Sequence, residues 1–179
     1  MKIINAMSNN EEDIYQNEEI KLLLSALNIT PGKYDAKKLR YGKLGICVDA
    51  DADGGHIALL IMAAMTYLAP DFIKEGRLCW LRSPLYIVNN RGNETYYFSD
   101  EEYNKVRGKI KGEVTRNKGL GELSAESARK SMFDPEYQRL DILEYDPHAI
   151  ELLTQLMGSD VTPRKDFIFK NVDFSTISE

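Results

Sequence analysis

Residues 44–57 read LGICVDADADGGHI, and this stretch decides the fold class. The short apolar run from Leu44 to Val48 predicts a β-strand that is buried on both faces. An acidic turn with aspartates at alternate positions follows, and the apolar run from Ile57 to Ala69 predicts a buried helix. A strand, a turn and an apolar helix form the first half of a parallel crossover unit, so the sequence predicts an α/β protein.

The rest of the chain predicts a partly parallel sheet followed by a helical tail. We expect strands at residues 77–81, 83–88, 95–98 and 113–117, with a hairpin turn at 89–93. We expect helices to start after the capping signals Asn17, Ser99, Asp146-Pro147 and Thr162-Pro163, and another near Ala125.

The composition is that of an ordinary globular protein. The 179 residues include 23 basic and 28 acidic side chains, and the net charge of -5 excludes a simple basic coat for nucleic acid. The two cysteines make neither a disulfide framework nor a zinc cluster, which favours a reducing cytosol. The longest apolar run is shorter than the ~20 residues of a membrane span, so we expect no membrane contact.

The acidic turn predicts a metal site. Residues two apart in an extended backbone point the same way, so Asp49 and Asp51 should converge at the carboxyl end of the strand. Like charges at such a place repel unless a cation neutralises them, and ligands that are all oxygen select Mg²⁺ or Mn²⁺.

Three other interpretations of this turn stay open. A calcium loop would need a glutamate at its twelfth position, which is Leu60, and a helix before it. A phosphatase of the haloacid dehalogenase type also places two alternating aspartates after a strand, but usually has Thr or Val where this chain has Asp53. The third interpretation is a solvated acidic turn in which Asp53 caps the helix.

A second segment has the composition of a phosphate contact. In Lys118-Gly119-Leu120-Gly121, two glycines permit close backbone approach to a phosphate and the lysine supplies charge. A plain turn between a strand and a helix is the alternative. The stretch before it is rich in basic residues: Lys105, Arg107, Lys109, Lys111 and Arg116. This local excess predicts a strip that faces DNA, against the alternative of a solvated face.

These motifs occur together in an order that resembles type II DNA topoisomerases. The resembling segments are Asn17-Glu18-Glu19-Ile20, Leu39-Arg40-Tyr41, residues 48–57, Pro84-Leu85-Tyr86, Lys118 to Glu122, Leu156-Met157-Gly158 and residues 163–168. They are similar to the second part of the TOPRIM region, and the tail after it, in the B-type half of gyrase and its relatives. The resemblance runs from Lys2 to about Asn171.

The resemblance implies a fold, a division of the chain and a set of partners. Residues 1–120 would form a Rossmann-like TOPRIM region of mostly parallel strands flanked by helices, and residues 121–179 a helical C-terminal tail. The TOPRIM glutamate, the ATPase region and the active-site tyrosine have no counterpart in this sequence. The resemblance therefore implies an incomplete subunit that is inactive alone, either a natural small subunit as in some phage enzymes or an excised fragment. Its partners would be duplex DNA, an ATPase-bearing B-type subunit that uses ATP, and a tyrosine-bearing A-type subunit.

The family's chemistry is the reversible, Mg²⁺-dependent cleavage of duplex DNA by that tyrosine. By resemblance, Asp49 would bridge two Mg²⁺ positions, which Mn²⁺ could also occupy, and Asp51 would complete the second. Asp53 would contribute less: it would either lie next to the metal ligands without binding the ion, or cap the following helix. Lys2 and Asn5 match DNA-contacting positions beside the metal site, and His56 would either touch phosphate or make a structural hydrogen bond. Arg116, Lys118, Gly119 and Gly121 complete the candidate DNA contacts.

Two other functions stay open. One is a non-enzymatic DNA-binding or assembly module that keeps a vestigial TOPRIM site. The other is a stand-alone TOPRIM nuclease, which would need its own glutamate; the candidates Glu11, Glu12, Glu18 and Glu19 lack a glycine-rich strand end. In each case the expected location is the cytoplasm of a prokaryotic or phage-infected cell.

Overall fold

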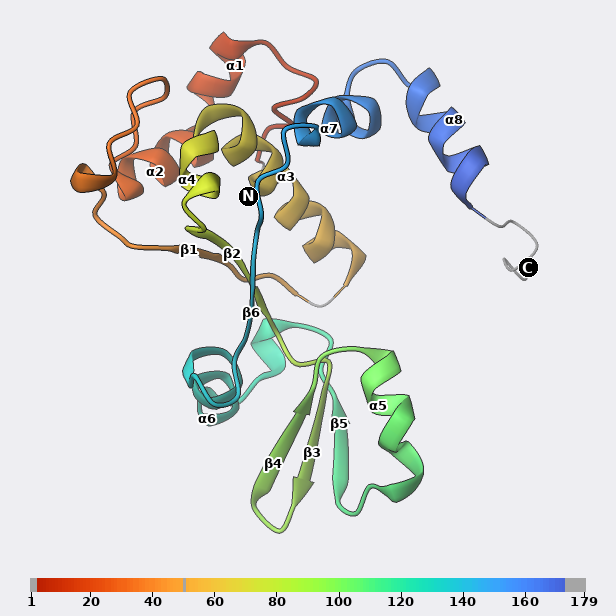
Figure 1. The fold of residues 1–179 in the computed structure, drawn as a ribbon. Helices are drawn as coiled ribbons and strands as arrows, with labels where there is room; N and C mark the ends of the chain where they lie inside the picture. Colours follow the sequence, from red (N-terminus) through yellow and green to blue (C-terminus); the bar gives the residue numbers. More distant parts are fainter. Residues whose placement is uncertain (1–2, 50, 173–179) are drawn as a thin grey trace. The chain divides into compact units, whose positions relative to one another are not determined.

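The computed structural model describes residues 3–49 and 51–172, which fall into two compact units. The first unit takes its described residues from Met1–Arg40, Leu60–Lys74 and Glu144–Glu179. The second unit comprises Tyr41–Leu59 and Glu75–Leu143 and contains every strand of the described chain. Helices and strands are mixed along the chain, as the α/β class predicted (Figure 1).

The first unit is helical. Its elements are α1 (Glu11–Gln16), α2 (Glu18–Leu27), the 3₁₀ turn η1 (Ala36–Lys38), the end of α3 (Ala52–Leu68), α4 (Pro70–Lys74), α7 (Ala149–Met157) and α8 (Thr162–Asn171). Asn17 caps α2 as predicted, because its side chain accepts a hydrogen bond from the Ile20 N–H at 3.1 Å. The side chains of Phe72, Ile14 and Ile20 are fully buried and form the centre of this unit.

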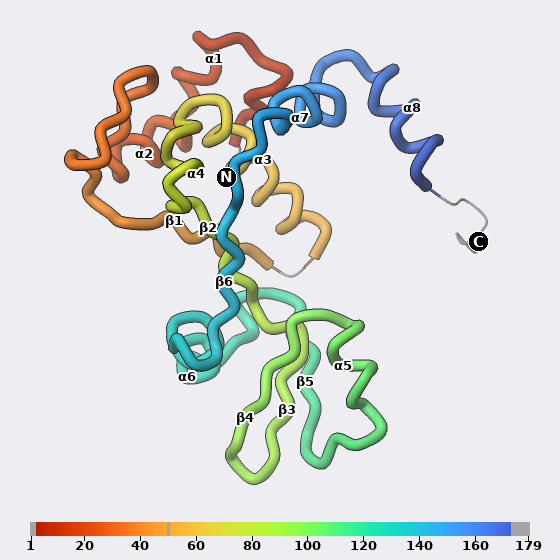
Figure 2. The backbone as a smooth tube through the Cα atoms, in the orientation of Figure 1, coloured from red at the N-terminus to blue at the C-terminus, as the bar shows by residue number. Residues whose placement is uncertain are grey.

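The second unit begins with a three-stranded sheet in the order β1-β2-β6. β1 (Leu44–Ile46) pairs in parallel with β2 (Leu78–Arg82), and β2 pairs antiparallel with β6 (Arg139–Ile142). In Figures 1 and 2, β6 runs beside β2 although the chain between them forms the whole second sheet. The helices α3 and α4 supply the long crossover that a parallel pair such as β1 and β2 requires.

Two predictions about this sheet are wrong. The strand after Lys43 has three residues, and its middle residue Gly45 is exposed, so it is not buried on both faces. The strands are not mostly parallel either, because β1–β2 is the one parallel pair among the four strand pairings of the described residues. Only β3 and β4 are joined by a link too short for a parallel pair, whereas β6 and β5 reach β2 and β3 after long intervening segments and also run antiparallel to them.

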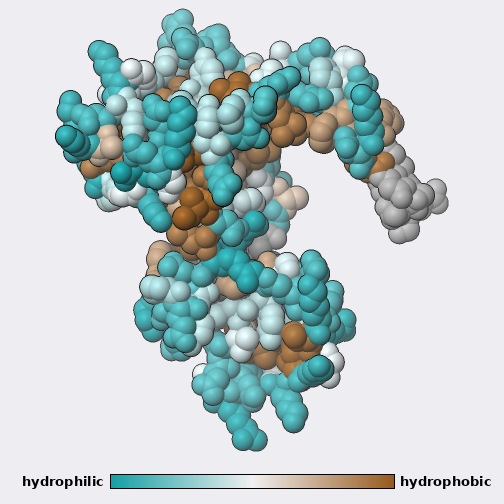
Figure 3. Space-filling model, in the orientation of Figure 1, coloured by the Kyte–Doolittle hydropathy of each residue, from teal (hydrophilic) through white to brown (hydrophobic). Residues whose placement is uncertain are grey.

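The second sheet, in the order β4-β3-β5, is antiparallel throughout. β3 (Tyr86–Asn90) and β4 (Asn93–Tyr97) form the predicted hairpin, and β5 (Glu113–Arg116) lies on the other side of β3. Arg91 and Gly92 both have positive φ angles, 55° and 89°, which are the angles of a two-residue hairpin turn that matches strand twist. The tip of this hairpin carries hydrophilic side chains (Figure 3).

Short helical elements connect the strands of the second unit. They are α5 (Asp100–Val106), the 3₁₀ turns η2 (Arg107–Lys109) and η3 (Leu120–Glu122), α6 (Ala125–Ala128) and the π-helical turn η4 (Arg129–Phe133). The predicted capping box at Ser99 is confirmed, since Ser99 Oγ accepts from the Glu102 N–H at 3.1 Å and Glu102 Oε2 accepts from the Phe98 N–H at 2.9 Å. The segment after residue 120 also contributes the strand β6, so the tail is not purely helical. The boundary at residues 120/121 stays a prediction.

Helix α3 is the apolar helix that follows the acidic turn. It starts in the second unit and ends in the first, and Ala58, Ala63, Ala64 and Met65 are at most 1% exposed. Among the described helices, α3 included, none combines the length and the apolar character that crossing a bilayer requires.

Candidate metal and nucleic-acid site

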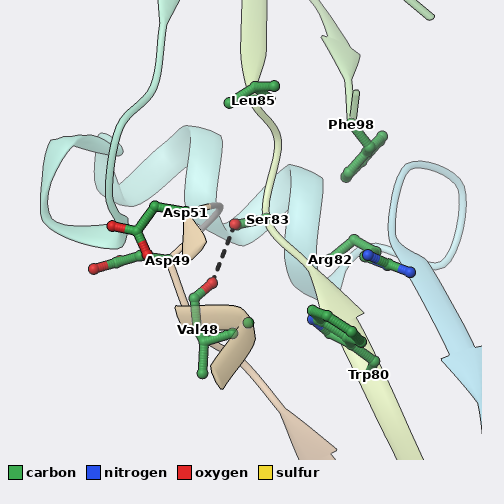
Figure 4. Close-up of a pocket in the computed structure, with 9 residues that line it drawn as sticks. Val48, Asp49, Asp51, Trp80, Arg82, Ser83, Leu85 and Phe98 are labelled. Carbon is green, nitrogen blue, oxygen red and sulfur yellow. Dashed lines mark hydrogen bonds between the residues drawn. The ribbon is translucent and has the colours of Figure 1, made fainter. Parts of the chain in front are cut away.

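A pocket of about 190 Å³ lies at the carboxyl end of β1, within the second unit. Its lining residues are Val48, Asp49, Asp51, Gly55, Trp80, Arg82, Ser83, Leu85 and Phe98. In Figure 4 the carboxylates of Asp49 and Asp51 lie next to each other and point to the same side. The two carboxylates thus converge beyond the end of β1, at the edge of the sheet where α/β proteins place ligands, although β1 itself ends at Ile46.

The Asp49 carboxylate is held by the loop that follows β5. Its Oδ1 atom accepts a hydrogen bond from the Leu120 N–H at 2.7 Å, and the side chain is otherwise exposed. Two motifs that lie far apart in the sequence, the acidic turn and Lys118-Gly119-Leu120-Gly121, therefore meet at one carboxylate.

Asp51 caps α3. Its Oδ1 accepts a hydrogen bond from the Gly54 N–H at 2.7 Å, which is the contact that an N-cap residue makes with the third residue of a helix. The alternative in which Asp53 is the cap is therefore wrong. Asp53 lies in the first turn of α3 instead, where its negative charge favours the positive end of the helix dipole.

Each of the two carboxylates keeps an oxygen atom for another ligand. In the described parts of the chain, Oδ1 of Asp49 and of Asp51 is bound by a backbone N–H, and Oδ2 has no hydrogen-bond partner. A pair of fixed, adjacent carboxylate oxygens is a suitable set of ligands for a hard cation such as Mg²⁺. Within residues 3–49 and 51–172, no group of three or more His, Cys, Asp or Glu side chains could hold a metal ion. The two aspartates therefore fit a site that is completed by water, by DNA or by other protein groups.

Cys47 adds no charged ligand to this edge. Burial of the thiol, together with the negative charge of nearby Asp49, raises the pKa of Cys47 above its ordinary value.

His56 and Asp53 do not line the pocket. Both side chains are exposed on the first turns of α3. The interpretation of the acidic turn as a calcium loop is wrong. A calcium loop follows a helix, whereas this turn follows the strand β1.

The candidate DNA-contacting residues lie at the end of β5 and in the loop after it, and all of them except half-buried Gly119 are exposed. Lys118 and Gly121 are exposed, and Gly119 passes so close to Asp49 that an added Cβ would lie 3.3 Å from its Oδ1. Arg116 is exposed and is shared between two neighbours, with Nη2 3.9 Å from Asp100 Oδ1 and its guanidinium 5.7 Å from the centre of the Tyr86 ring.

The two candidates at the start of the chain are placed differently. Lys2 lies outside the described residues. Asn5 belongs to the first unit and its side chain is used internally: Nδ2 donates to the Met157 carbonyl at 2.8 Å, and Oδ1 accepts from the Met7 N–H at 3.0 Å. Neither residue has a described place in the pocket, so their role in DNA binding stays a prediction.

The wall of the pocket opposite the aspartates was not predicted from the sequence. The Arg82 guanidinium stacks over Trp80 at 4.1 Å, and its Nε lies 2.6 Å from Asp141 Oδ2, across the antiparallel pair (Figure 4). Ser83 Oγ donates to the Val48 carbonyl at 3.3 Å and so connects the ends of the two parallel strands. The sequence does hold a signal for Ser83, because parallel neighbours end at the same edge of a sheet and Ser83 follows β2 as Asp49 follows β1.

Comparison with known proteins finds that the chain is similar to gyrase B proteins. Residues 109–169 match the family model described as "DNA gyrase B subunit, carboxyl terminus". The gyrase B protein of Clostridium acetobutylicum is 35% identical over 95% of this chain and 28% of its own length. The corresponding protein of Archaeoglobus fulgidus is 36% identical over 96% of this chain and 29% of its own length. The resemblance that the motifs indicated is confirmed, and the chain spans between a quarter and a third of these relatives.

A solved structure shares the fold. The DNA-binding, cleavage and re-ligation domain of topoisomerase II from Plasmodium falciparum aligns with 99% of this chain at a TM-score of 0.80. Its sequence identity is 20%, and this chain covers 25% of it. The match supports the α/β class and the arrangement of elements.

Proposed function

We propose that this chain, a relative of gyrase B proteins, is part of an ATP-dependent type II DNA topoisomerase and supplies carboxylate ligands for Mg²⁺-dependent cleavage and religation of duplex DNA. The observation that carries the proposal is the adjacent pair Asp49 and Asp51, each held through Oδ1 by a backbone N–H with Oδ2 left for a cation. The reaction class is inferred from the gyrase B relatives, and the metal chemistry is inferred from the pair Asp49 and Asp51.

The chain's own residues would prepare the site before DNA arrives. Asp49 and Asp51 would hold Mg²⁺, or Mn²⁺ in its place, with Asp53 contributing only negative charge from α3. The bound ion would stabilise charge on the phosphate and on the leaving 3′ oxygen. The nucleophilic tyrosine, the TOPRIM glutamate and ATP hydrolysis would come from other chains or segments, so this chain would be inactive alone. We place the activity in the cytoplasm of a prokaryotic or phage-infected cell.

The proposed path of DNA runs over the basic stretch before and within the Lys118 loop. We expect Lys118→Ala to weaken DNA binding and to make its salt dependence shallower, with the slope of log K against log salt falling by about one unit, because one phosphate contact is lost. Fluorescence anisotropy with a labelled duplex over a range of salt concentrations measures the slope. Lys38→Ala, on an exposed turn of the first unit, serves as the control. An unchanged slope for Lys118→Ala would take this lysine out of the DNA path.

The proposal as a whole is tested by reconstitution. We expect the chain, mixed with ATPase-bearing and tyrosine-bearing subunits, to relax supercoiled plasmid when ATP and Mg²⁺ are both present, and each component to be inactive by itself. Agarose gels of the plasmid topoisomers report the result. Relaxation by this chain alone would contradict the proposal.

A non-enzymatic DNA-binding or assembly module is the second candidate. It is favoured by one observation, that no third acidic ligand joins Asp49 and Asp51 among the residues the structure describes. Such a module would assemble with its partners and bind DNA, yet the complex would neither cleave DNA nor respond to divalent cations.

A further inference from the structure

The loop from Asn117 to Glu122 is tied to the residues before β3 at its first residue and closed by internal hydrogen bonds at its last. Asn117 is 2% exposed, and it donates from its backbone N–H to the Leu85 carbonyl and from Nδ2 to the Pro84 carbonyl, each at 2.9 Å. At the other end, Glu122 Oε2 accepts from the Lys118 N–H at 2.8 Å, and the Glu122 N–H donates to the Gly119 carbonyl at 3.0 Å. The loop is therefore rigidly tied to the entry of β3 before it reaches the acidic turn.

This fixed loop touches the Asp49 side chain at two adjoining residues. The Leu120 N–H binds Oδ1 at 2.7 Å, and a Cβ at Gly119 would lie 3.3 Å from Oδ1, 3.4 Å from Cγ and 3.5 Å from Oδ2. The backbone of Gly119 is extended, with φ at −161°, so its conformation is open to any residue. A side chain at residue 119 would therefore press on the Asp49 carboxylate and shift it, while the backbone dihedral angle would tolerate the substitution.

We infer that Gly119 and the Leu120 N–H position the Asp49 carboxylate for metal binding, by anchoring Oδ1 and leaving Oδ2 turned toward the cation. The inference rests on the proposed function, in which Asp49 is a metal ligand. A carboxylate ligand that is oriented by a hydrogen bond binds its ion more tightly than a freely rotating one, and loss of such a bond commonly weakens metal affinity 10–100-fold. Gly119 and Leu120 are therefore positioning residues that act through Asp49.

The test measures Mn²⁺ affinity of the 179-residue chain in the absence of DNA, by the decrease of the free Mn²⁺ signal in electron paramagnetic resonance. We expect Gly119→Ala to weaken binding about tenfold or more, because its methyl group displaces the carboxylate. The matched control is Gly42→Ala, in the same unit but outside the pocket, whose Cβ would meet nothing within 4 Å and which should keep the affinity within about twofold of wild type. Melting temperatures of both variants separate lost affinity from lost folding.

A second variant removes the hydrogen bond and leaves Gly119 unchanged: the proline ring replaces the N–H with a methylene group, which also displaces Asp49 Oδ1 from its present position. Leu120 is the first residue of η3, a position that accepts proline, and Gly119 before it already has the extended conformation that a residue before proline prefers. Leu120→Pro deletes the N–H donor and should also weaken Mn²⁺ binding about tenfold. In wild-type protein the Leu120 amide resonance should shift during a Mg²⁺ titration, and Asp49→Ala should abolish that shift.

The outcomes distinguish a failure of the positioning role from a failure of the proposed metal site. If Asp49→Ala itself leaves Mn²⁺ affinity unchanged, the proposed metal site is wrong. If Asp49→Ala abolishes binding while Gly119→Ala and Leu120→Pro bind like Gly42→Ala, the metal site stands and the positioning role is wrong. If the two loop variants lose DNA affinity alone, the glycine serves the approach of a phosphate and the positioning role is again wrong.

Discussion

Asp49→Asn and Asp51→Asn are each expected to lower the rate of DNA cleavage by the reconstituted enzyme at least ~100-fold, which is the largest effect that the structure implies. Asparagine keeps the Oδ1 acceptor, so the hydrogen bonds from the Leu120 N–H and the Gly54 N–H survive. What disappears is the negative charge that would hold Mg²⁺. The measurement is the yield of linear DNA from plasmid at a series of Mg²⁺ concentrations.

Asparagine is a more specific test than alanine, because it removes the charge and keeps the hydrogen-bond acceptor. Asp51→Ala would also remove the cap of α3 and lower the free energy of unfolding by about 1 kcal/mol, so that lost activity would have two explanations. Asp53→Asn, in the same turn but outside the pocket, should reduce cleavage less than about tenfold. Wild-type cleavage rates for Asp49→Asn and Asp51→Asn would show that these carboxylates do not bind the ion.

Gly54→Ala is expected to lower the free energy of unfolding by about 3 kcal/mol, the upper part of the range for overpacked sites. Gly54 is buried in the first turn of α3, and a Cβ there would lie 2.2 Å from the Asp49 carbonyl oxygen and 3.0 Å from its backbone C and N atoms. These are backbone atoms that no side-chain rotation can move away. The helix must shift from the end of β1, and the acidic turn shifts with it.

The neighbouring glycine supplies the control for this prediction. A Cβ at Gly55 would meet nothing within 4 Å, so Gly55→Ala should raise the free energy of unfolding by about 0.5–1 kcal/mol through its better helix propensity. Urea unfolding followed by fluorescence reports on the correct region, because Trp80, the one tryptophan of the sequence, lies in the second unit with both glycines. Equal effects of the two substitutions would contradict the close packing of α3 on Asp49.

Some local signals in the sequence predicted local structure, whereas α7 and α8 begin after His148 and Val161, without the caps predicted at Asp146 and Thr162. Asn17 and Ser99 cap the helices that their hydrogen-bonding capacity indicated, and the hairpin turn falls at Arg91 and Gly92, inside the predicted 89–93 segment. Such features depend on neighbours only a few residues away. The nearness of Asp49 and Asp51 was also predicted from local sequence, although they lie beyond the end of β1 and Asp51 caps α3.

Features that depend on distant parts of the chain could not be predicted in the same way. The sequence offers three aspartates at the start of this helix, and the structure shows that Asp51 is the cap and that Gly54 packs against the Asp49 backbone. The contact between Asp49 and Leu120 joins two motifs that were interpreted separately, one for metal and one for phosphate. β6 was missed because its four residues are mostly exposed, and its pairing with β2 is what makes it a strand.

The place of β6 in the sheet has a consequence for how the protein is made. β2 lies between β1, which precedes it in the chain, and β6, which is synthesised only after all three strands of the second sheet. Until residue 142 emerges, one edge of β2 has no neighbour, although Leu78, Cys79 and Leu81 need to be buried. Completion of this sheet is therefore a late event in biosynthesis, and a nascent chain that stalls before residue 142 exposes an edge at which chains aggregate.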